Sequence, residues 1–212
     1  VVATNGSTMR DLTAGARYDV PVPPFGGSEG YAFSPDGHEL AYTAKDAGRE
    51  EAWSTDVNVY TVPVAGGAPT VITASSKGAD QNPAYSPDGR SIAYASQARA
   101  GFEADRWRLM MYDRTSRSAR ELVPAWDRNA ESYFFAPDGR TLFVGTGDRG
   151  RDKLFRVALT AAGTAVAAPA AEITANNNTG FTASRDGRTI AWLRDAVDHP
   201  AEVWVRTDIP TK

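Results

Sequence analysis

The sequence predicts an all-β fold made of repeated four-stranded antiparallel units. Three observations support this prediction: a turn motif that recurs at nearly equal spacing, a short apolar run after each copy, and a more alternating segment further on. The turn motif and its apolar run each occur four times in a chain of 212 residues. A repeat of about 50 residues is typical of propellers, so we interpret each unit as one β-propeller blade.

The repeated motif reads Ser-Pro-Asp-Gly in its clearest copies, with an aromatic residue before it. The copies span residues 33–37, 85–89, 135–139 and 183–187, and their glycines lie 52, 50 and 48 residues apart. Proline presets φ at the second position of a turn, and aspartate can bond to the local backbone. Glycine takes the left-handed conformation that ends a three-residue hairpin loop. Each copy therefore predicts a β-hairpin.

The residues after each turn are almost all apolar, which is typical of strands buried on both faces. These runs span residues 40–42, 92–94, 142–144 and 190–192. A second hairpin follows, and its first strand is expected at 57–62, 108–112, 153–157 and 202–206. More polar strands at 70–73, 120–123 and 172–174 close the first three units. The alternative fold, a single β-sandwich, does not require the same turn in every unit.

We expect one propeller domain over residues 1–212, with about four blades present: three complete blades plus partial ends. The blades are expected at about 29–73, 82–123, 131–174 and 179–206, with 1–13 as the end of a preceding blade. That first strand would close a four-bladed ring, but rings run from about four to eight blades. Because the chain also starts without Met, an incomplete part of a larger propeller is the favoured interpretation. Open strand edges then predict self-association.

Composition excludes several classes of function. Lys plus Arg total 23 and Asp plus Glu total 26, so the net charge of −3 provides no basic excess for a nucleic-acid partner. The absence of cysteine removes disulfides, thiolate metal sites and a cysteine nucleophile. No apolar run of about 18 residues is present, so no membrane partner is expected.

Two catalytic motifs occur in the sequence without the context that their chemistry needs. Residues 26–30 fit the G-x-S-x-G nucleophile elbow, which requires a strand before the serine, a helix after it and a histidine base. Only His38, after a turn glycine, and His199, expected in a loop, could be that base. Residues 145–150 fit G-x-G-x-x-G, but a hairpin is expected where a dinucleotide site needs a helix. We therefore expect no catalytic residue and no cofactor.

No metal site is expected either, because the chain has two histidines, no cysteine and scattered aspartates. Asp148 and Asp152, beside glycines, are the less favoured alternative as ligands of a hard cation.

The second loop of each of the first two blades is long and rich in charged and aromatic residues. These loops span residues 44–56 and 97–106, and propellers place function on long loops gathered at one rim. The candidate substrate-binding residues are Glu50, Glu51, Trp53, Glu103, Asp105 and Arg106. Carboxylates flanked by aromatic rings can hold a cationic group such as an ammonium. An ordinary solvated surface is the alternative.

The repeat (Phe/Tyr)-Ser-Pro-Asp-Gly-Arg followed by Ile-Ala-Tyr resembles the WD40-like repeats of TolB and of the prolyl oligopeptidase family. Two loop segments, 49–54 and 101–106, are similar to loops in the bacterial dipeptidyl-peptidase and acylaminoacyl-peptidase branch of that family. The resemblance extends over essentially the whole chain.

This resemblance implies a gating propeller that caps an α/β-hydrolase domain with a Ser-Asp-His triad and admits short peptides. In dipeptidyl peptidases, acidic propeller residues hold the α-ammonium of the substrate, and Glu50, Glu51, Glu103 and Asp105 occupy similar positions here. The hydrolase domain is missing, so this chain alone is not expected to hydrolyse peptides. A bacterial protein of the periplasm or the exterior is implied. The alternatives are a non-enzymatic, TolB-like protein-binding propeller and a self-contained scaffold.

Overall fold

The computed structural model describes residues 9–23, 26–160 and 170–207. Within them, the regular elements are β-strands and two short 3-10 helices, η1 (Ser28–Gly30) and η2 (Gly48–Glu50). The chain divides into two compact units, Val1–Tyr85 with Ser96–Asp105, and Ser86–Ala95 with Arg106–Lys212.

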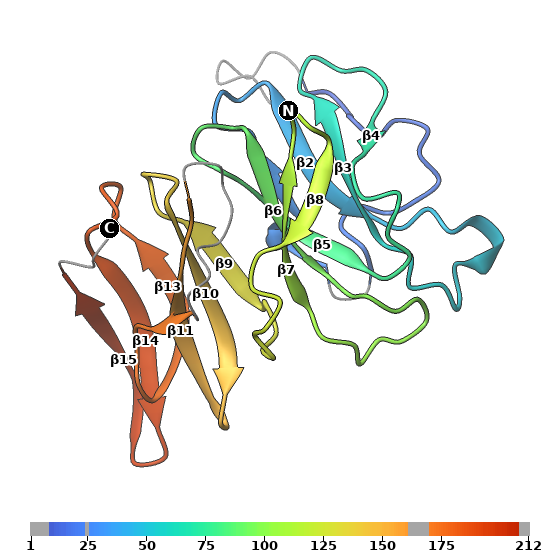
Figure 1. Cartoon of the computed structure of the whole chain (residues 1–212). Helices are drawn as coiled ribbons and strands as arrows, with labels where there is room; N and C mark the ends of the chain where they lie inside the picture. The colour runs from blue at the N-terminus through green and yellow to red at the C-terminus, as the bar shows by residue number, and fades with distance from the viewer. Residues whose placement is uncertain (1–8, 24–25, 161–169, 208–212) are drawn as a thin grey trace. The chain divides into compact units, whose positions relative to one another are not determined.

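The strands form four antiparallel sheets, and in each sheet the spatial order follows the chain order. Figure 1 shows each sheet as a run of neighbouring strands in one colour range. The first sheet contains β1 (Tyr31–Phe33), β2 (Glu39–Ala44), β3 (Asn58–Pro63) and β4 (Thr70–Val71). The second contains β5 (Asp80–Tyr85), β6 (Ser91–Ser96), β7 (Arg108–Asp113) and β8 (Ser118–Glu121).

The third sheet contains β9 (Ser132–Phe135), β10 (Thr141–Asp148), β11 (Arg151–Ala158) and β12 (Ala171–Glu172). The last contains β13 (Asn177–Ala183), β14 (Ile190–Ala196) and β15 (His199–Arg206). Antiparallel sheets of about four strands that follow one another in chain order are the blades of a propeller. The predicted fold class, all-β with about four antiparallel blades, is confirmed.

The predicted blade limits remain predictions. Residues 1–8 lie outside the described part of the chain, and between residues 9 and 13 the structure has one isolated β-bridge, at Met9. The assignment of residues 1–13 to a preceding blade therefore stays a prediction as well.

The Ser-Pro-Asp-Gly motif forms a hairpin turn stabilised by its own side chains. In the first copy the Ser34 N–H donates to the Glu39 carbonyl at 2.9 Å, and the Gly37 N–H donates to the Ser34 carbonyl at 2.9 Å. Ser34 Oγ accepts from the Glu39 N–H at 2.9 Å and donates to the Asp36 carboxylate at 2.6 Å. Gly37 has the left-handed φ, +72°, that the motif predicts.

This geometry corrects one detail of the sequence prediction. Ser34 pairs with Glu39, so four residues separate the paired positions where a three-residue loop was expected. Ala136 pairs with Thr141 in the same way, its N–H donating to the Thr141 carbonyl at 2.8 Å, so the four-residue turn does not depend on the serine hydroxyl.

Two of the other three copies repeat these side-chain bonds. Ser86 and Ser184 each donate a 2.6 Å hydrogen bond to the aspartate of their own motif. In the third copy Ala136 stands in place of the serine, while Asp138 still accepts the Arg140 N–H at 2.9 Å. The third turn therefore lacks the hydroxyl that stabilises the others.

Successive turns of the second unit also contact one another. A Cβ placed on Gly187 would lie 2.5 Å from Cδ of Pro137, and one on Gly139 would lie 3.6 Å from Cδ of Pro87. Gly187 is therefore required by packing as well as by its φ of +70°. The motif serves both the turn and the contact between neighbouring blades.

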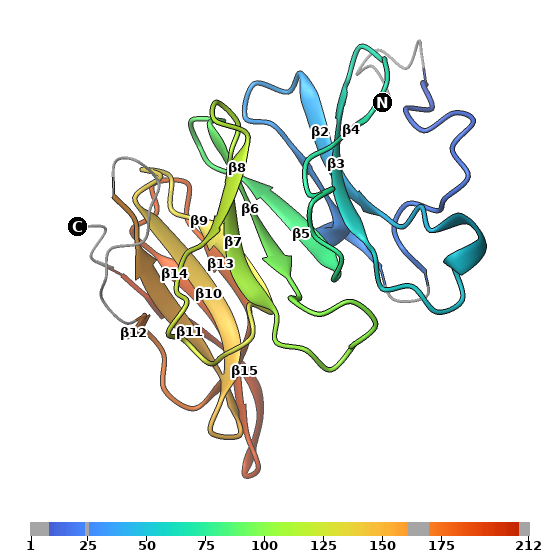
Figure 2. The ribbon, with the colours of Figure 1, turned by 45° about the vertical axis from the view of Figure 1, so that its right-hand side comes forward.

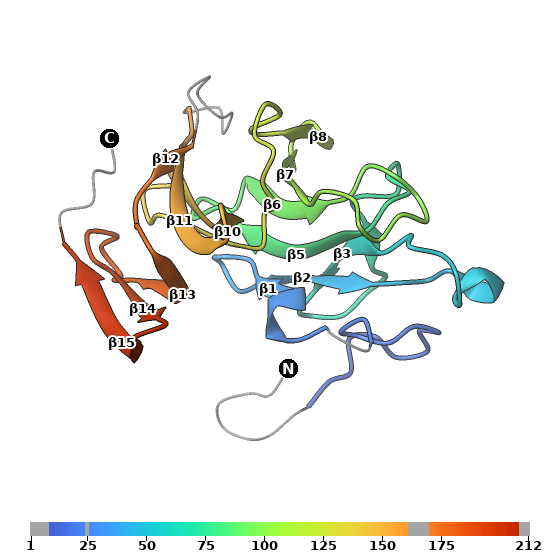
Figure 3. The same cartoon turned by 90° about the horizontal axis from the view of Figure 1, so that it is seen from below.

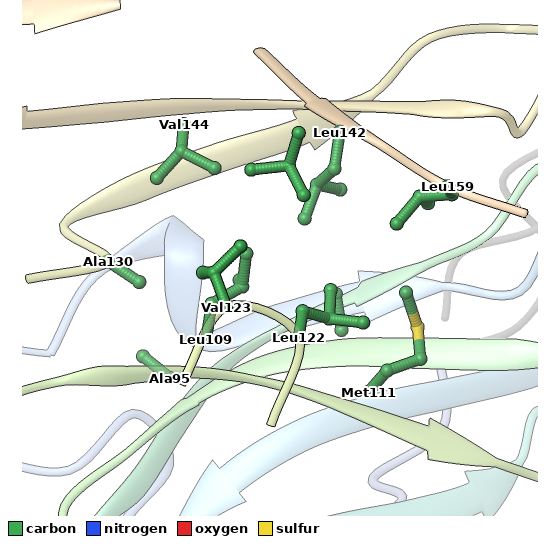
Figure 4. Packing of buried hydrophobic residues seen from close by; sticks show 11 residues of the cluster. Ala95, Leu109, Met111, Leu122, Val123, Ala130, Leu142, Val144 and Leu159 are labelled. Atoms are coloured by element: carbon green, nitrogen blue, oxygen red, sulfur yellow. The ribbon is translucent and has the colours of Figure 1, made fainter. Parts of the chain in front are cut away.

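The inner strands bury both faces, because their side chains alternate between two hydrophobic clusters of the second unit. Leu142 and Val144 of β10 belong to one cluster with Leu109 and other residues of β6, β7 and β11, while Phe143 belongs to the other cluster. Figure 4 shows Leu142 and Val144 within the first cluster, and Figure 2 shows β10 beside β11. The second cluster joins Phe143 to Ile190 and neighbours on the last sheet. The continuous apolar runs of the sequence follow from this two-sided burial.

The first unit has a smaller cluster built around tyrosines. Tyr42 and Tyr60 stack with ring centroids 5.3 Å apart, and the hydroxyls of Tyr18 and Tyr42 are 2.8 Å apart. Leu12 and Val20 pack against the same cluster. Residues that precede the first strand therefore cover one face of the first sheet.

We expect Ala136→Ser to stabilise the protein. The new hydroxyl would accept the Thr141 N–H and donate to Asp138, as serine does in the other turns, which corresponds to about 0.5–1.5 kcal/mol of unfolding free energy. Ser86→Ala should lose a similar amount. Urea unfolding curves measure both changes, and equal midpoints for all three proteins would contradict the role given to the hydroxyl.

Candidate functional site

The two long loops that carry the candidate residues lie between β2 and β3 and between β6 and β7. We call residues 45–57 and 97–105 together the acidic rim; both segments belong to the first unit. In the first segment Asp46, Glu50, Glu51 and Asp56 outnumber Lys45 and Arg49. Figure 3 shows the η2 turn within the β2–β3 connection.

Glu50 and Trp53 lie on one helical turn. The Trp53 N–H donates to the Glu50 carbonyl at 3.0 Å, and the Ser54 N–H donates to the same carbonyl at 2.8 Å. Residues three apart on such a turn are neighbours on its surface. Trp53 is 70% exposed, which is unusual for a large aromatic side chain. Within the described part of the chain, the Glu50 carboxylate has no hydrogen-bond or ion-pair partner, so it is free to bind a cation.

Glu51, next to Glu50, is partly neutralised. Its carboxylate lies 3.1 Å from Lys45 Nζ, and that same ammonium donates to the Glu51 carbonyl at 2.7 Å and to the Ser54 carbonyl at 3.2 Å. Lys45 therefore fixes the turn to the end of β2 and lowers the negative charge available at Glu51.

The second segment is closed by two of its own side chains. Gln97 is 2% exposed, and its amide donates to the carbonyls of Glu103 at 2.8 Å and Asp105 at 2.9 Å. The Asp105 carboxylate accepts from the N–H groups of Ala98 at 3.0 Å and Arg99 at 2.9 Å. Asp105 thus holds the loop together from inside.

The Arg99 guanidinium completes this closed loop. It donates to Asp105 at 2.8 Å, and that hydrogen bond raises the pKa of Arg99. Arg99 also lies 4.1 Å above the centre of the Phe102 ring, so this face of Phe102 is already occupied by a cation. Glu103 is exposed, and its carboxylate makes no hydrogen bond or ion pair to any residue that the structure describes.

A hydrogen bond joins the two segments of the rim, from the Gly101 N–H to Thr55 Oγ1 at 2.8 Å. Burial raises the pKa of Tyr60, on β3, to about 12, and the negative charge of Asp46 raises it further. The rim therefore presents free carboxylates at Glu50 and Glu103 and an open aromatic face at Trp53.

Arg106, the sixth candidate, lies in the second unit. Its guanidinium donates to Glu121 at 2.7 Å and to the Trp126 carbonyl at 2.7 Å. These bonds join the start of β7 to the chain beyond β8. Substrate binding by Arg106 stays a prediction, and so does substrate binding by the other five candidate residues.

Sequence comparison relates this chain to much longer proteins. It is 33% identical over 144 residues to dipeptidyl-peptidase 5 of Porphyromonas gingivalis, covering 66% of this chain and 21% of that protein. It is 35% identical over 158 residues to a probable dipeptidyl-peptidase 5 of Aspergillus clavatus, with the same coverage of 66% and 21%. No protein-family model matches the chain.

Structure comparison supports the propeller. TolB from Acinetobacter baumannii superposes with a TM-score of 0.59 at 18% identity, over 84% of this chain and 40% of TolB. A puromycin-hydrolyzing peptidase of Mycobacterium tuberculosis gives 0.59 at 20% identity, over 86% of this chain and 28% of the peptidase. These identities establish the fold alone.

The chain is thus a propeller segment related in sequence to dipeptidyl-peptidase 5. It spans about a fifth of the length of these curated relatives. The described residues contain no helix long and apolar enough to cross a membrane.

The G-x-S-x-G segment of this peptidase-related chain does not form a nucleophile elbow. Ser28 lies in the three-residue helix η1, which leads directly into β1. His199 opens strand β15, so its expected position in a loop is wrong; the hairpin between β14 and β15 is shorter than the sequence suggests. His38 lies in the first motif turn, where its N–H donates to Asp36 at 3.0 Å.

The G-x-G-x-x-G segment is part of a long β-hairpin. Gly145 and Gly147 lie within β10, and Arg149 and Gly150 form a two-residue turn with φ of 53° and 75°. Positive φ at both positions is typical of the tight turns that connect antiparallel strands. A Cβ on Gly145 would lie 2.4 Å from Ser132 Oγ, so packing explains this glycine without a phosphate ligand.

Asp148 is saturated by protein cations, which argues against the alternative cation site with Asp152. Arg128 donates to one carboxylate oxygen at 2.9 and 2.6 Å, and Lys153 donates to the other at 2.9 Å. Lys153 also pairs with Glu172 at 3.0 Å. In the part of the chain that the structure describes, no three metal-ligating side chains gather. No local sequence pattern indicates this ion-pair network, because Arg128 is 20 residues from Asp148 and Glu172 is 19 residues from Lys153.

Asp148→Asn should weaken the fold in a pH-dependent way. The hydrogen bond from Lys153, followed by that from Arg128, lowers the pKa of Asp148. A carboxyl with a lowered pKa stabilises the folded state above its unfolded pKa of about 3.9, and this stability is lost as the pH falls through the lower folded pKa. The variant should therefore be less stable at pH 7 and lose less stability on acidification.

Unfolding free energies measured between about pH 7 and pH 2 test this expectation. Asp152→Asn is the matched control, since it removes a neighbouring carboxylate outside the network. Equal pH profiles for wild type and Asp148→Asn would show that the network does not stabilise the fold.

Proposed function

We propose that this chain is a substrate-gating propeller segment of a serine peptidase that removes short N-terminal units from oligopeptides. The sequence relationship to dipeptidyl-peptidase 5, at about a third identity over two thirds of the chain, is the observation that carries the proposal. In this proposal the chain supplies binding groups, and the catalytic groups belong to an α/β-hydrolase domain elsewhere in the longer protein.

The proposed ligand of the acidic rim is the α-ammonium of the peptide. Glu50 and Glu103 are exposed carboxylates without a protein cation, so each can accept a charge-assisted hydrogen bond from the ammonium. Trp53 lies on the same turn as Glu50 and offers its ring face to the same positive charge. Glu51 contributes less, because Lys45 already neutralises part of its charge.

Such a rim would act by positioning. Fixing the amino terminus of a peptide at a set distance from a nucleophile selects which peptide bond reaches it, and no covalent step is needed in the propeller. Asp105 would support the rim through its internal bonds. Arg106, which follows the rim in the sequence, binds Glu121 and the Trp126 carbonyl instead. A peptidase of free oligopeptides suits the bacterial periplasm or the exterior of the cell, which is the location we propose.

A TolB-like, non-enzymatic binding propeller is the second candidate. The superposition on TolB over 84% of this chain supports this candidate at the level of the fold. One propeller fold serves many unrelated functions, however, so the decision depends on the rim. Binding of free amines by the rim would favour the peptidase function over the TolB-like candidate.

Glu50→Gln and Glu103→Gln should each raise KM for peptides with a free amino terminus. Loss of a charge-assisted hydrogen bond is worth about 1.5–3 kcal/mol, which corresponds to about a tenfold or larger increase. Steady-state kinetics of the full-length protein measures this change, with kcat expected to stay nearly constant.

Glu131→Gln, an exposed glutamate outside the rim, is the matched control. N-acetylated peptides are the matched substrates, since they lack the ammonium and should be insensitive to both rim variants. Unchanged KM in both variants would overturn the anchor, whereas a full-length protein without peptidase activity would favour the TolB-like candidate.

We also propose that this chain self-associates through β15. Among the described residues, β15 is an outer strand of its sheet, and Val203 and Val205 are 76% and 62% exposed. An antiparallel pair of β15 strands from two copies can place Glu202 opposite Arg206 and Val203 opposite Val205. Opposite charges and valines in cross-strand pairs stabilise such an edge contact.

Light scattering over a concentration series of this chain tests the edge contact. We expect a dimer that Val203→Lys weakens, because a lysine on an edge strand disfavours pairing. Val71→Lys, on another outer strand, is the control. A monomer at every concentration would refute the contact.

A further inference from the structure

We infer that Thr55 is a positioning residue that sets the relative placement of Glu50 and Glu103. This inference deepens the proposed function and rests on it. Thr55 Oγ1 accepts the Gly101 N–H at 2.8 Å, a contact between residues 46 positions apart in the sequence. This hydrogen bond joins the two segments of the rim directly.

Thr55 is itself held on both sides. Before it, the Ser54 carbonyl accepts Lys45 Nζ at 3.2 Å. After it, the Asp56 N–H donates to Ser54 Oγ at 3.1 Å, and the Asp56 carboxylate accepts Lys77 Nζ at 3.1 Å. A hydroxyl between two fixed neighbours is a fixed acceptor.

Gly101 belongs to a loop that is held together by its own hydrogen bonds. The buried Gln97 amide holds the carbonyls of Glu103 and Asp105, and the Asp105 carboxylate closes the loop onto the N–H groups at its start. Gly101 lies at the tip, with φ of +71° and open space on its Cβ side. Fixing its N–H therefore fixes the loop that carries Glu103, two residues further on.

The consequence is a binding pair that is organised before the ligand arrives. Glu50 lies on the turn that precedes Thr55, and Glu103 on the loop that Thr55 holds. A ligand that meets two carboxylates already in place loses less free energy to ordering them, so its affinity is higher. Thr55 touches neither carboxylate, and its effect on binding passes through the two segments of the rim.

Two substitutions separate the hydroxyl from the shape of the side chain. Thr55→Val keeps the branched shape and removes the acceptor, while Thr55→Ser keeps the hydroxyl. In the full-length protein we expect Thr55→Val to raise KM for free-amine peptides about 3- to 10-fold, the range of one modest hydrogen bond. We expect kcat, and KM for N-acetylated peptides, to stay unchanged. Thr55→Ser should behave as wild type.

A second readout does not depend on activity. Hydrogen exchange of the Gly101 amide, measured by NMR on this chain, should be faster in Thr55→Val than in wild type and unchanged in Thr55→Ser. Faster exchange at Gly101 with unchanged exchange in β2 and β3 would show a local loss of the bond in a folded protein.

The outcomes distinguish this inference from the proposed function. If Glu103→Gln raises KM but Thr55→Val does not, the positioning role is wrong and the anchor stands. Equal increases for Thr55→Val and Thr55→Ser would also overturn it, because the hydroxyl would then be irrelevant. If Glu50→Gln and Glu103→Gln leave KM unchanged, the proposed function itself fails.

Discussion

Burial of both faces of the inner strands is the constraint on which the rest of this structure depends. Leu142 and Val144 of β10 face one hydrophobic cluster, and Phe143 between them faces another. A strand of this kind is stable only between two neighbours, so the sheets must follow one another along the chain. The turns are also packed against one another. Pro137 of the preceding turn lies so close to Gly187 that a side chain at position 187 would clash with it.

A scaffold fixed in this way leaves its long loops free to carry chemistry. The two segments of the acidic rim place no side chain in the clusters of apolar residues, and they hold themselves in shape with polar bonds. Gln97 and Lys45 bind backbone carbonyls, and Asp105 binds backbone N–H groups. The carboxylate of Asp105 is occupied by these internal bonds, and Lys45 neutralises part of the charge of Glu51. The carboxylates of Glu50 and Glu103 remain exposed. The same network that gives the rim its shape therefore decides which of its carboxylates can meet a ligand.

The relationship to dipeptidyl-peptidase 5 and the superposition on TolB answer different questions. The first is a likeness of sequence and suggests what the rim is for; the second is a likeness of fold and leaves function open. Under the proposed function, binding groups held by internal hydrogen bonds would suit a peptidase that fixes the amino terminus of its substrate, because the distance from anchor to cleavage site must not vary.

The sequence by itself determined the blades, since a repeated turn and apolar runs are local signals that survive in every copy. It also identified the loops of the rim by their length and charge. It did not show that His199 opens a strand, that four residues lie between the paired Ser34 and Glu39, or that Asp148 is bound by Arg128 and Lys153. The sequence also did not distinguish the exposed carboxylates of Glu50 and Glu103 from that of Asp105, which is bound within its own loop. The partners lie from five residues away, as Lys153 does from Asp148, to twenty residues away, as Arg128 does. Only the folded loops and their packing bring these groups within hydrogen-bond distance.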